Sequence, residues 1–600
     1  MTIARLQRVT LYGLSEDKES LMTALQEAGC MHIVPLHEVG PLEPANAGQL
    51  RRAHSAYRHL NEAPRQLRPW TTDRAIDIQA TVEAALKNKD RLREARDRRD
   101  FLAERIAGLR PFGDFALPPD DALRGMKLWF YVLPAKKRMA LRKLDLPWQI
   151  VGRDRGHLYV VLISREEPPA AILPVPRSHI GSQPLSALLE ELEKAEIEIE
   201  EAQIERAELA RSRFALGVRL AQAEDADDRR AAARMARDSE RVFAIQGWVP
   251  ISDTGRIRSL AEAGHLAVVF EDPGPGDTPP TLLEVPGPFS GSGGLTTFYM
   301  TPSYRDWDPS LVIFSSFCIF FAMILADAGY ALVLSGSLAL FWQRMGRSRG
   351  GRQARILLAV MMAVAFIYGV LAGSWFGVAP PKGSLLNRIA FIDATDFKTM
   401  MRVSIMVGVV QIALANAEVA WRSRSASLAT TKIGWIVAMF GGLWIWLASA
   451  ATGHTTLAAG LAIVLAGLAM VFIGTAAQHS FKRPLDLLLG VALGALAVTR
   501  ATKLFGDALS YMRLFALGLA SVSLAATFNS LATKIAAGLP GIGLLFAIIV
   551  LLFGHSINIA LGILDGVVHG LRLNYIEFFG WALADEGYPF KAFARRRTLT

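Results

Sequence analysis

Hydrophobic and polar residues divide the chain into two halves with different patterns. Up to about residue 300, charged residues interrupt the apolar stretches, whereas the later apolar runs are long enough to cross a bilayer. These runs fall near 311–342, 356–378, 401–421, 433–452, 456–477, 504–536 and 540–573. The pattern predicts a mixed fold class, in which α/β lobes joined by an antiparallel coiled coil precede an all-α membrane domain.

The first half alternates strand-like segments with charged helices. We expect an α+β lobe built from residues 1–50 and 240–272, because both stretches read as short strands around amphipathic helices. Helical arms are predicted at about 50–110 and 184–238, with a distal lobe at 111–183 between them. These parts together form a predicted cytoplasmic domain, 1–285, followed by a Pro/Gly-rich linker, 286–305, and a membrane domain, 306–600.

The second arm carries a seam of apolar residues with alternating spacings of three and four. Its members are Leu185, Leu188, Leu192, Ala195, Ile199 and Ala202. Such spacing is typical of a coiled coil, whose nearest partner is the first arm running antiparallel. The alternative is that each arm is only a solvated charged helix.

The run 311–342 decides the number of membrane spans. As one helix its roughly 32 residues would extend about 48 Å, against a hydrocarbon core of about 30 Å. A break at Asp327-Ala328-Gly329 gives two short spans and puts the Arg-rich loops on the cytoplasmic side. We therefore predict eight spans with both termini cytoplasmic, in an inner (plasma) membrane. The stretch 485–498 is too short to cross and reads as an interfacial or re-entrant helix.

Composition narrows the class of protein further. The net charge of +10 comes from basic residues in loops between apolar runs, where positive-inside bias accounts for them better than nucleic-acid binding does. Only Cys30 and Cys318 are present, so neither a disulfide framework nor a Cys-rich metal site is expected. The opening residues lack the apolar region of a signal peptide, which predicts a cytoplasmic N-terminus.

Two arginines lie inside apolar runs, Arg513 and Arg572. A charge in hydrocarbon costs about 2.5–3.5 kcal/mol, so such residues usually face a protein or water interior and serve ions. Arg513 lies about ten residues from the cytoplasmic end of its span, which places it near the bilayer midplane. A structural salt bridge that only locks helices together is the alternative.

The last span carries polar residues at spacings of three and four. They are His555, Asn558, Gly562, Asp565, His569 and Arg572, and they share one helical face. Such a face predicts a wet path for ions or, equally, a helix interface. Asp565 and His569 stand one turn apart and can touch, which favours a proton relay. Glu577 and Asp585 continue the acidic character beyond the span.

Both spans resemble a known family. FGDALSYMRLFALGLA and GHSINIALGILDGVVHGLRLNYIEFF are similar to the last two membrane helices of the a-type stator subunit, called subunit I in bacteria, of rotary V-type and A-type ATPases. The resemblance extends to QGWVP at 246–250, to Asp327, Gly329 and Tyr330 of a hairpin motif, to YGVLAGSWFG at 368–377 and to VGVVQIALA at 407–415.

The resemblance implies a non-catalytic stator subunit with two ion half-channels against a ring of proteolipid subunits. It would couple proton or sodium translocation to ATP hydrolysis or synthesis, with peripheral-stalk subunits attached to the cytoplasmic domain, and it would need no cofactor or metal. Arg513 and Arg572 match the family's two intramembrane arginines. The residues expected along the ion path are Arg513, Arg572, Asp565, His569, Glu577, His555, Asn558, Ser521 and Asp507.

Three positions depart from the family pattern. Eukaryotic members have a histidine where this chain has Ser521 and an acid where it has Gly562, a role for which Asp565 stands one turn away. The residue before the hairpin aspartate is usually glycine and is Ala326 here.

Two other classes of protein are alternatives to this family. A secondary transporter or channel with a cytoplasmic regulatory domain would use intramembrane Arg, Asp and His similarly, but repeated helix sets are not evident. The chain has no GxxxxGK[ST], HExxH or GxSxG motif, so ATP hydrolysis by this chain alone is not expected.

Overall fold

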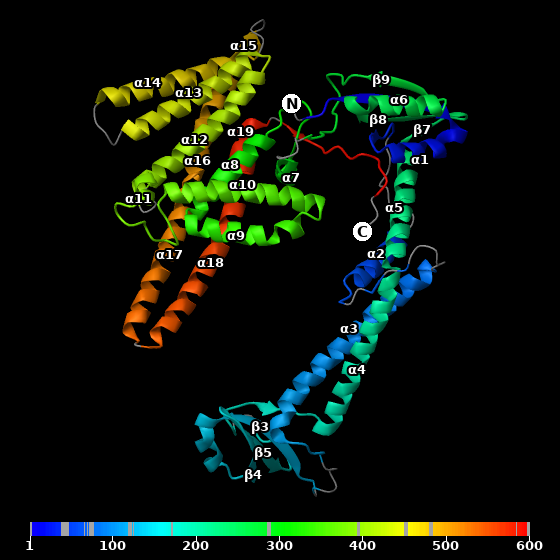
Figure 1. The fold of residues 1–600 in the computed structure, drawn as a ribbon, viewed down its shortest axis with the longest axis vertical. Helices are drawn as coiled ribbons and strands as arrows, with labels where there is room; N and C mark the ends of the chain where they lie inside the picture. The colour runs from blue at the N-terminus through cyan, green and yellow to red at the C-terminus, as the bar shows by residue number, and fades with distance from the viewer. Residues whose placement is uncertain are drawn as a thin grey trace.

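The computed structural model describes residues 3–37, 47–64, 67–68, 70, 77–117, 123, 125–169, 172–284, 290–392, 396–448, 454–478, 484–539, 541–583 and 585–596. Two small sheets lie at opposite ends of a set of long helices, and a larger helical part lies beside the first sheet (Figure 1). The larger helical part begins after about residue 290, where the apolar runs of the sequence begin.

The first sheet joins strands from both ends of the N-terminal part of the chain. Its strands are β1 (Leu6–Leu14), β2 (His32–Val34), β7 (Arg237–Asp238), β8 (Val242–Pro250) and β9 (Ala267–Glu271), in the order β2-β8-β1-β9 with β7 paired to β8. β1 and β8 pair antiparallel over their full length. Alternate residues such as Val9, Leu11 and Ile245 pack against α1 (Lys18–Ala28) and α6 (Thr254–Ala263), because the period of a strand is two.

The second sheet lies at the far end of the long helices (Figure 1). It consists of β3 (Lys127–Pro134), β4 (Trp148–Arg153), β5 (His157–Ser164) and β6 (Arg177–Ser178), in the order β4-β5-β3-β6. Its main core contains Trp129, Leu133, Val160 and Leu162, which are buried.

Long helices connect the two sheets. They are α2 (Ala47–Asn61), α3 (Ile78–Leu109), α4 (Leu185–Leu209) and α5 (Arg213–Met235). α3 and α4 run antiparallel, because Arg91 pairs with Glu198 at 3.2 Å while Arg98, later in α3, pairs with Glu191, earlier in α4, at 3.6 Å. Four of the six predicted seam residues are buried along α4, namely Leu188, Ala195, Ile199 and Ala202. The supercoil itself stays a prediction.

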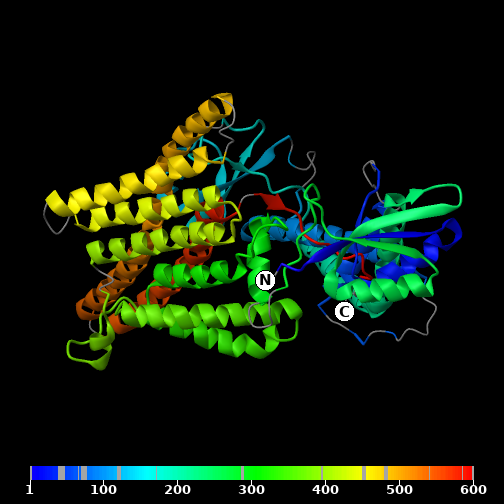
Figure 2. The same cartoon turned by 90° about the horizontal axis from the view of Figure 1, so that it is seen from above.

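The C-terminal part is helical. Its helices are α7 (Ser290–Tyr299), α8 (Ser310–Leu325), α9 (Ala328–Met345), α10 (Arg349–Leu371), α11 (Leu385–Ile389), α12 (Phe397–Arg422), α13 (Ala426–Ala448), α14 (His454–Ala476), α15 (Pro484–Thr499), α16 (Ala501–Ser510), α17 (Met512–Gly538), α18 (Gly543–Arg572) and α19 (Phe579–Ala582). α17 and α18 form a hairpin tilted steeply relative to α13 and α14, and Figure 2 shows α12, α13 and α14 side by side. Within the described residues, six helical segments are long and apolar enough to cross a membrane.

The run 311–342 is two helices. α8 ends at Leu325 and α9 begins at Ala328, so the interruption is at Ala326 and Asp327, next to the predicted break. α8 is an apolar helix of 16 residues, shorter than the six. The count of eight spans, which needs both α8 and α9 to cross, stays a prediction, as does the interfacial position of the stretch now seen as α15.

The chain leaves the soluble part and returns to it at one place. β10 (Thr301–Pro302), before α8, pairs with β11 (Glu586–Gly587), after α19. The last described residues then run along the first lobe, where the Phe593 N–H donates to the Met31 carbonyl at 2.8 Å and Arg596 pairs with Glu224 at 3.0 Å and Asp228 at 3.1 Å. Both ends of the helical part therefore lie next to each other.

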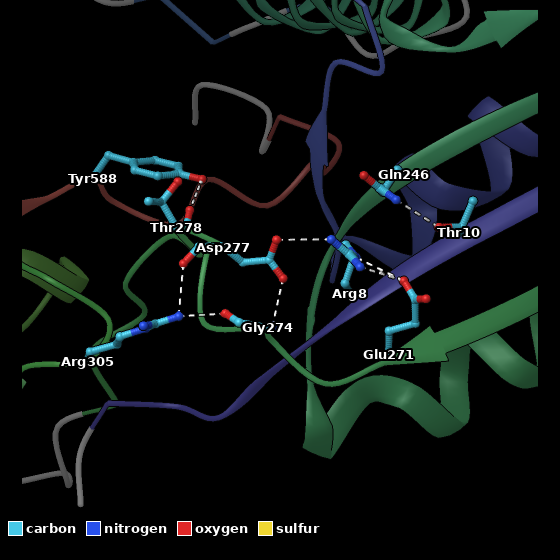
Figure 3. A network of polar contacts seen from close by, with 9 residues as sticks. All are labelled: Arg8, Thr10, Gln246, Glu271, Gly274, Asp277, Thr278, Arg305 and Tyr588. Atoms are coloured by element: carbon cyan, nitrogen blue, oxygen red, sulfur yellow. Dashed lines mark hydrogen bonds and ion pairs between the residues drawn. The ribbon is translucent and has the colours of Figure 1, made fainter. Parts of the chain in front are cut away.

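Polar contacts hold this junction together (Figure 3). Arg305, just before α8, donates to the carbonyl oxygens of Gly274 at 2.5 Å and Asp277 at 3.3 Å. The Asp277 carboxylate pairs in turn with Arg8 of β1 at 3.1 Å. The Tyr588 hydroxyl donates to the Thr278 carbonyl at 2.9 Å. The first lobe thus contacts both the segment that precedes the helices and the segment that follows them.

Ala326 carries backbone strain that a glycine would relieve. Its φ is +50°, in the left-handed region where the Cβ of an L-residue costs about 1–2 kcal/mol. We expect Ala326→Gly to leave the melting temperature of the purified chain unchanged or raised, because relief of strain offsets the loss of a buried methyl group. Ala322→Gly is the matched control: Ala322 is equally buried but lies inside α8, so that variant should melt lower. An equal decrease in the melting temperature of both variants would contradict backbone strain at Ala326.

Candidate functional site

Asp327 organises the loop that interrupts the membrane helices. Its carboxylate is 2% exposed and accepts four hydrogen bonds: from the Tyr330 N–H at 3.0 Å, the Ser374 hydroxyl at 2.7 Å, the Phe376 N–H at 3.0 Å and the Gly377 N–H at 2.8 Å. Phe376 and Gly377 have φ of +53° and +73°. One side chain therefore caps α9 and also holds the turn that follows α10.

A second polar network lies between α9, α17 and α18. The Tyr330 hydroxyl contacts His555 Nδ1 at 2.7 Å and accepts from Asn558 Nδ2 at 3.0 Å. Asn558 also donates to the Ser521 carbonyl at 2.8 Å, and its Oδ1 accepts from the Ser521 hydroxyl at 3.3 Å. His555 Nε2 contacts Asn529 Oδ1 at 3.1 Å. The structure thus brings together His555, Asn558, Ser521 and Tyr330, with Asp327 and Gly329 in the adjoining turn.

Glycine makes the contact between α18 and α8. Gly562, Gly566 and Gly570 are buried at intervals of four, and a Cβ at Gly566 would lie 2.6 Å from the Phe321 ring. Small residues at such spacing let helix backbones approach closely. The sequence placed Gly562 on the polar face of the last span and marked it as a departure from a family acid, whereas the GxxxGxxxG spacing was the signal for this packing. The six-residue polar face therefore spans two environments, a buried interface and a more open one.

Arg513 is the second residue of α17 and has an incompletely satisfied guanidinium. Its Nη1 is shielded from solvent and has no hydrogen-bond partner among the described residues. The charge of Arg513 acts electrostatically on both His569 and Glu577. The depth of Arg513 in a bilayer stays a prediction.

Glu577 is the buried acid of this region. It is 3% exposed, and its Oε2 lacks a hydrogen-bond partner among the described residues. It lies in a π-helical turn, Leu573–Phe578, that follows α18, and such turns are frequent at functional sites. Arg513 and Arg572 both act on its charge. Tyr511, fully buried beside it, also has a hydroxyl without a partner in the described part of the chain.

The remaining predicted residues occupy more open positions. His569 Nε2 lies 3.9 Å from Asp565 Oδ1, and these side chains are 28% and 34% exposed. Arg572, at the end of α18, is exposed. Asp507, on α16, accepts a hydrogen bond from Trp581 Nε1 at 2.7 Å. The predicted residues thus form two groups: one around Tyr330 and His555, the other around Arg513 and Glu577.

A buried amide cluster was missed by sequence reasoning. Asn574 Oδ1, in the π-helical turn, accepts from the Ser316 hydroxyl at 2.6 Å and from Gln411 Nε2 at 2.8 Å. All three residues are less than 9% exposed. Gln411 is a lone polar residue in the apolar segment VGVVQIALA, and that isolation was the available signal. The cluster fixes the turn that carries Glu577 against α8 and α12.

In the described residues, no three His, Cys, Asp or Glu side chains gather in a way that could hold a metal ion. An arginine with a shielded free donor beside a buried acid can bind or discharge an arriving carboxylate, because a nearby cation favours the ionised form.

The chain is similar in sequence to proteins named subunit I of V-type and A-type ATP synthases. The chain is 26% identical to the V-type ATP synthase subunit I of Chlamydia pneumoniae, over 58% of this chain and 60% of the relative. It is 27% identical to the A-type ATP synthase subunit I of Methanocaldococcus jannaschii, over 60% and 56%. The chain resembles subunit I. The resemblance expected from its last two membrane helices is thus confirmed.

Other comparisons add less. The V-type ATP synthase subunit I of Borreliella burgdorferi is 28% identical, over 58% of this chain and 59% of the relative. A solved cytoplasmic N-terminal domain of subunit I, homologous to subunit a of V-ATPase, aligns over 44% of this chain and 99% of that domain, with 16% identity and a TM-score of 0.24. The aligned part of this chain spans about 60% of the length of the curated relatives, and no family model matches.

Proposed function

We propose that the chain is the non-catalytic stator subunit of the membrane sector of a rotary V/A-type ATPase. It forms two ion half-channels against a proteolipid ring and couples translocation of protons, or alternatively sodium ions, to ATP hydrolysis or synthesis. The observation that carries the proposal is Arg513, whose shielded Nη1 lacks a partner in the described structure and whose charge acts on Glu577 and His569.

The surface next to Arg513 suits a passing helix. On α17 the positions that follow it at helical spacing, Ala516, Ala520, Ser523 and Thr527, are exposed and small. Another helix can therefore approach the backbone closely. A carboxylate carried on that helix is favoured in its ionised form when it meets Arg513, and it releases its ion to one half-channel. The fixed charge also opposes leakage of cations straight across.

We assign the group around Glu577 to the cytoplasmic-side half-channel. Asp565, His569 and Arg572 extend from α18 toward the π-helical turn, and Asp507 lies on the neighbouring α16. The junction with the soluble lobe follows directly after α19, so this end of the hairpin faces the lobe. The group around His555, Asn558 and Ser521 lies toward the other end of the hairpin and belongs to the opposite path.

The soluble domain anchors the peripheral stalks in this proposal. Its antiparallel helices α3 and α4 place the second sheet far from the first (Figure 1). Two attachment points at opposite ends of a long arm suit a part that must resist torque. Purification of the chain from its native membrane, followed by identification of co-migrating subunits, tests the whole proposal. Ring and stalk subunits are expected, whereas a chain that purifies alone would favour a transporter or channel.

The first prediction concerns Arg513. In membrane vesicles that contain the assembled complex, Arg513→Ala should abolish ATP-driven ion transport, because no cation then discharges the ring carboxylate. Arg513→Lys should also lose most transport, since an ammonium lacks the planar fork of the guanidinium. Lys534→Ala, an exposed site farther along α17, is the control and should pump normally. Near-normal pumping by the Arg513→Ala variant would overturn the role.

The second prediction concerns Asp565. If Asp565 and His569 relay protons, Asp565→Asn should leave assembly intact, slow transport and change its pH profile. If they only join helices, the same variant should weaken assembly more than transport. Asp396→Asn removes an exposed carboxylate at the start of α12 and should change neither. An Asp565→Asn complex that pumps at the normal rate at every pH rules out the relay.

The third prediction concerns topology. The Arg-rich loop between α9 and α10 is cytoplasmic in the eight-span arrangement. The contact of α10 with α7, the helix that follows the N-terminal domain, supports this orientation of the loop. In a chain with Cys30 and Cys318 replaced by serine, a cysteine at Arg347 should resist an impermeant maleimide applied to intact cells. A cysteine at Lys382, in the connection from α10 to α12, should react. Labelling at position 347 would contradict the eight-span count.

A further inference from the structure

A cavity of about 800 Å³ lies between α12, α13, α14, α15, α16 and α19, and Trp581 of its wall donates to the ion-path residue Asp507 at 2.7 Å. Its wall includes five basic residues and one acid: Arg305, Arg422, Lys432, Arg500 and Lys503, with Asp306. Such an excess of positive charge in one hollow predicts an anionic occupant.

Among the described residues, only one of the five basic side chains forms an ion pair. Arg422 pairs with Glu418 on its own helix. Within the described residues, neither Arg500 nor Lys503 has a carboxylate within ion-pair distance. The Lys432 ammonium group has three donor hydrogens. Among the described residues it donates to one acceptor, the Trp581 carbonyl, at 3.2 Å. Donors thus remain available to a ligand with several acceptor oxygens.

The rest of the wall is aromatic and apolar. Trp307, Trp435 and Trp581 line it, and the Trp435 and Trp581 rings lie 5.6 Å apart. Leu428, Leu493 and Leu496 complete an apolar side. Tryptophan concentrates where hydrocarbon meets water. The cavity therefore has a charged end and an apolar end, as an amphipathic ligand requires.

The cavity lies at the end of the bundle that faces the soluble lobe. Trp307 Nε1 donates to the Ala582 carbonyl at 3.0 Å, which ties the start of α8 to α19 beside the β10–β11 pair. Arg305, in the same wall, also contacts Gly274 of the lobe junction (Figure 3). Basic pockets between membrane helices at this level bind anionic headgroups.

We propose that this cavity binds one anionic phospholipid. The headgroup phosphate is held by Arg500, Lys503 and Lys432, whose donors match its oxygens. The acyl chains lie along Leu428, Leu493 and Leu496. The lipid would join α13, α15 and the C-terminal α19, and this role does not depend on the proposed ion path.

Native mass spectrometry of the purified full chain tests the site. Phosphatidylglycerol and phosphatidylcholine with identical acyl chains are titrated separately, and retention of the anionic lipid is expected to be stronger. The variant that combines Arg500→Gln with Lys503→Gln should weaken phosphatidylglycerol binding about twenty-five-fold, the product of about fivefold for each basic residue. Arg500→Lys, which keeps the charge, should retain most of the binding.

A charge-matched control separates a built site from general attraction. Arg388→Gln with Lys534→Gln removes two exposed basic residues from the other end of the bundle and should leave binding unchanged. Equal loss in both double variants would overturn the proposal. So would inorganic phosphate that binds as tightly as the lipid, because the occupant would then be a soluble anion. Melting temperatures of the two double variants in phosphatidylcholine nanodiscs verify that both remain folded.

Discussion

The membrane half depends on satisfying the backbone where α8 and α9 separate. An interrupted helix leaves N–H groups without partners, and in hydrocarbon each such group costs several kcal/mol. The buried Asp327 carboxylate accepts hydrogen bonds from one N–H group at the start of α9 and from two N–H groups and one hydroxyl in the turn after α10. With that turn fixed, α8 presents Phe317 and Phe321 to the glycines of α18, and Tyr330 reaches His555. The position of the α17–α18 hairpin follows from these contacts.

The sequence was most informative for features that depend on a single chain segment. Six of the seven long apolar runs correspond, within the described residues, to helical segments long enough to cross a membrane, and the acidic break in the first run marks a true interruption. The spacing of Leu188, Ala195 and Ile199 marks the buried side of α4. In each case hydrophobic periodicity acts within a single element, so that no partner needs to be known.

Features that depend on a distant partner were not predictable in the same way. Nothing in the order of residues says that Asn574 meets Ser316 and Gln411, which lie 258 and 163 positions away. Likewise, periodicity puts His555, Asn558 and Asp565 on one face of α18, but only packing against α8 and α9 separates buried Asn558 from half-exposed Asp565. The polar face on which the ion path was predicted is thus divided by its neighbours.

The tail that follows α19 has a mechanical consequence. A lobe joined to a bundle by one strand of chain can swivel about that strand. Here the segment around Arg305 and the segment from Tyr588 to Arg596 hold the lobe at separate points, on β1 and on α1 and α5. Two separated attachments restrict rotation of the lobe about either one, so the lobe and the bundle resist swivelling relative to each other.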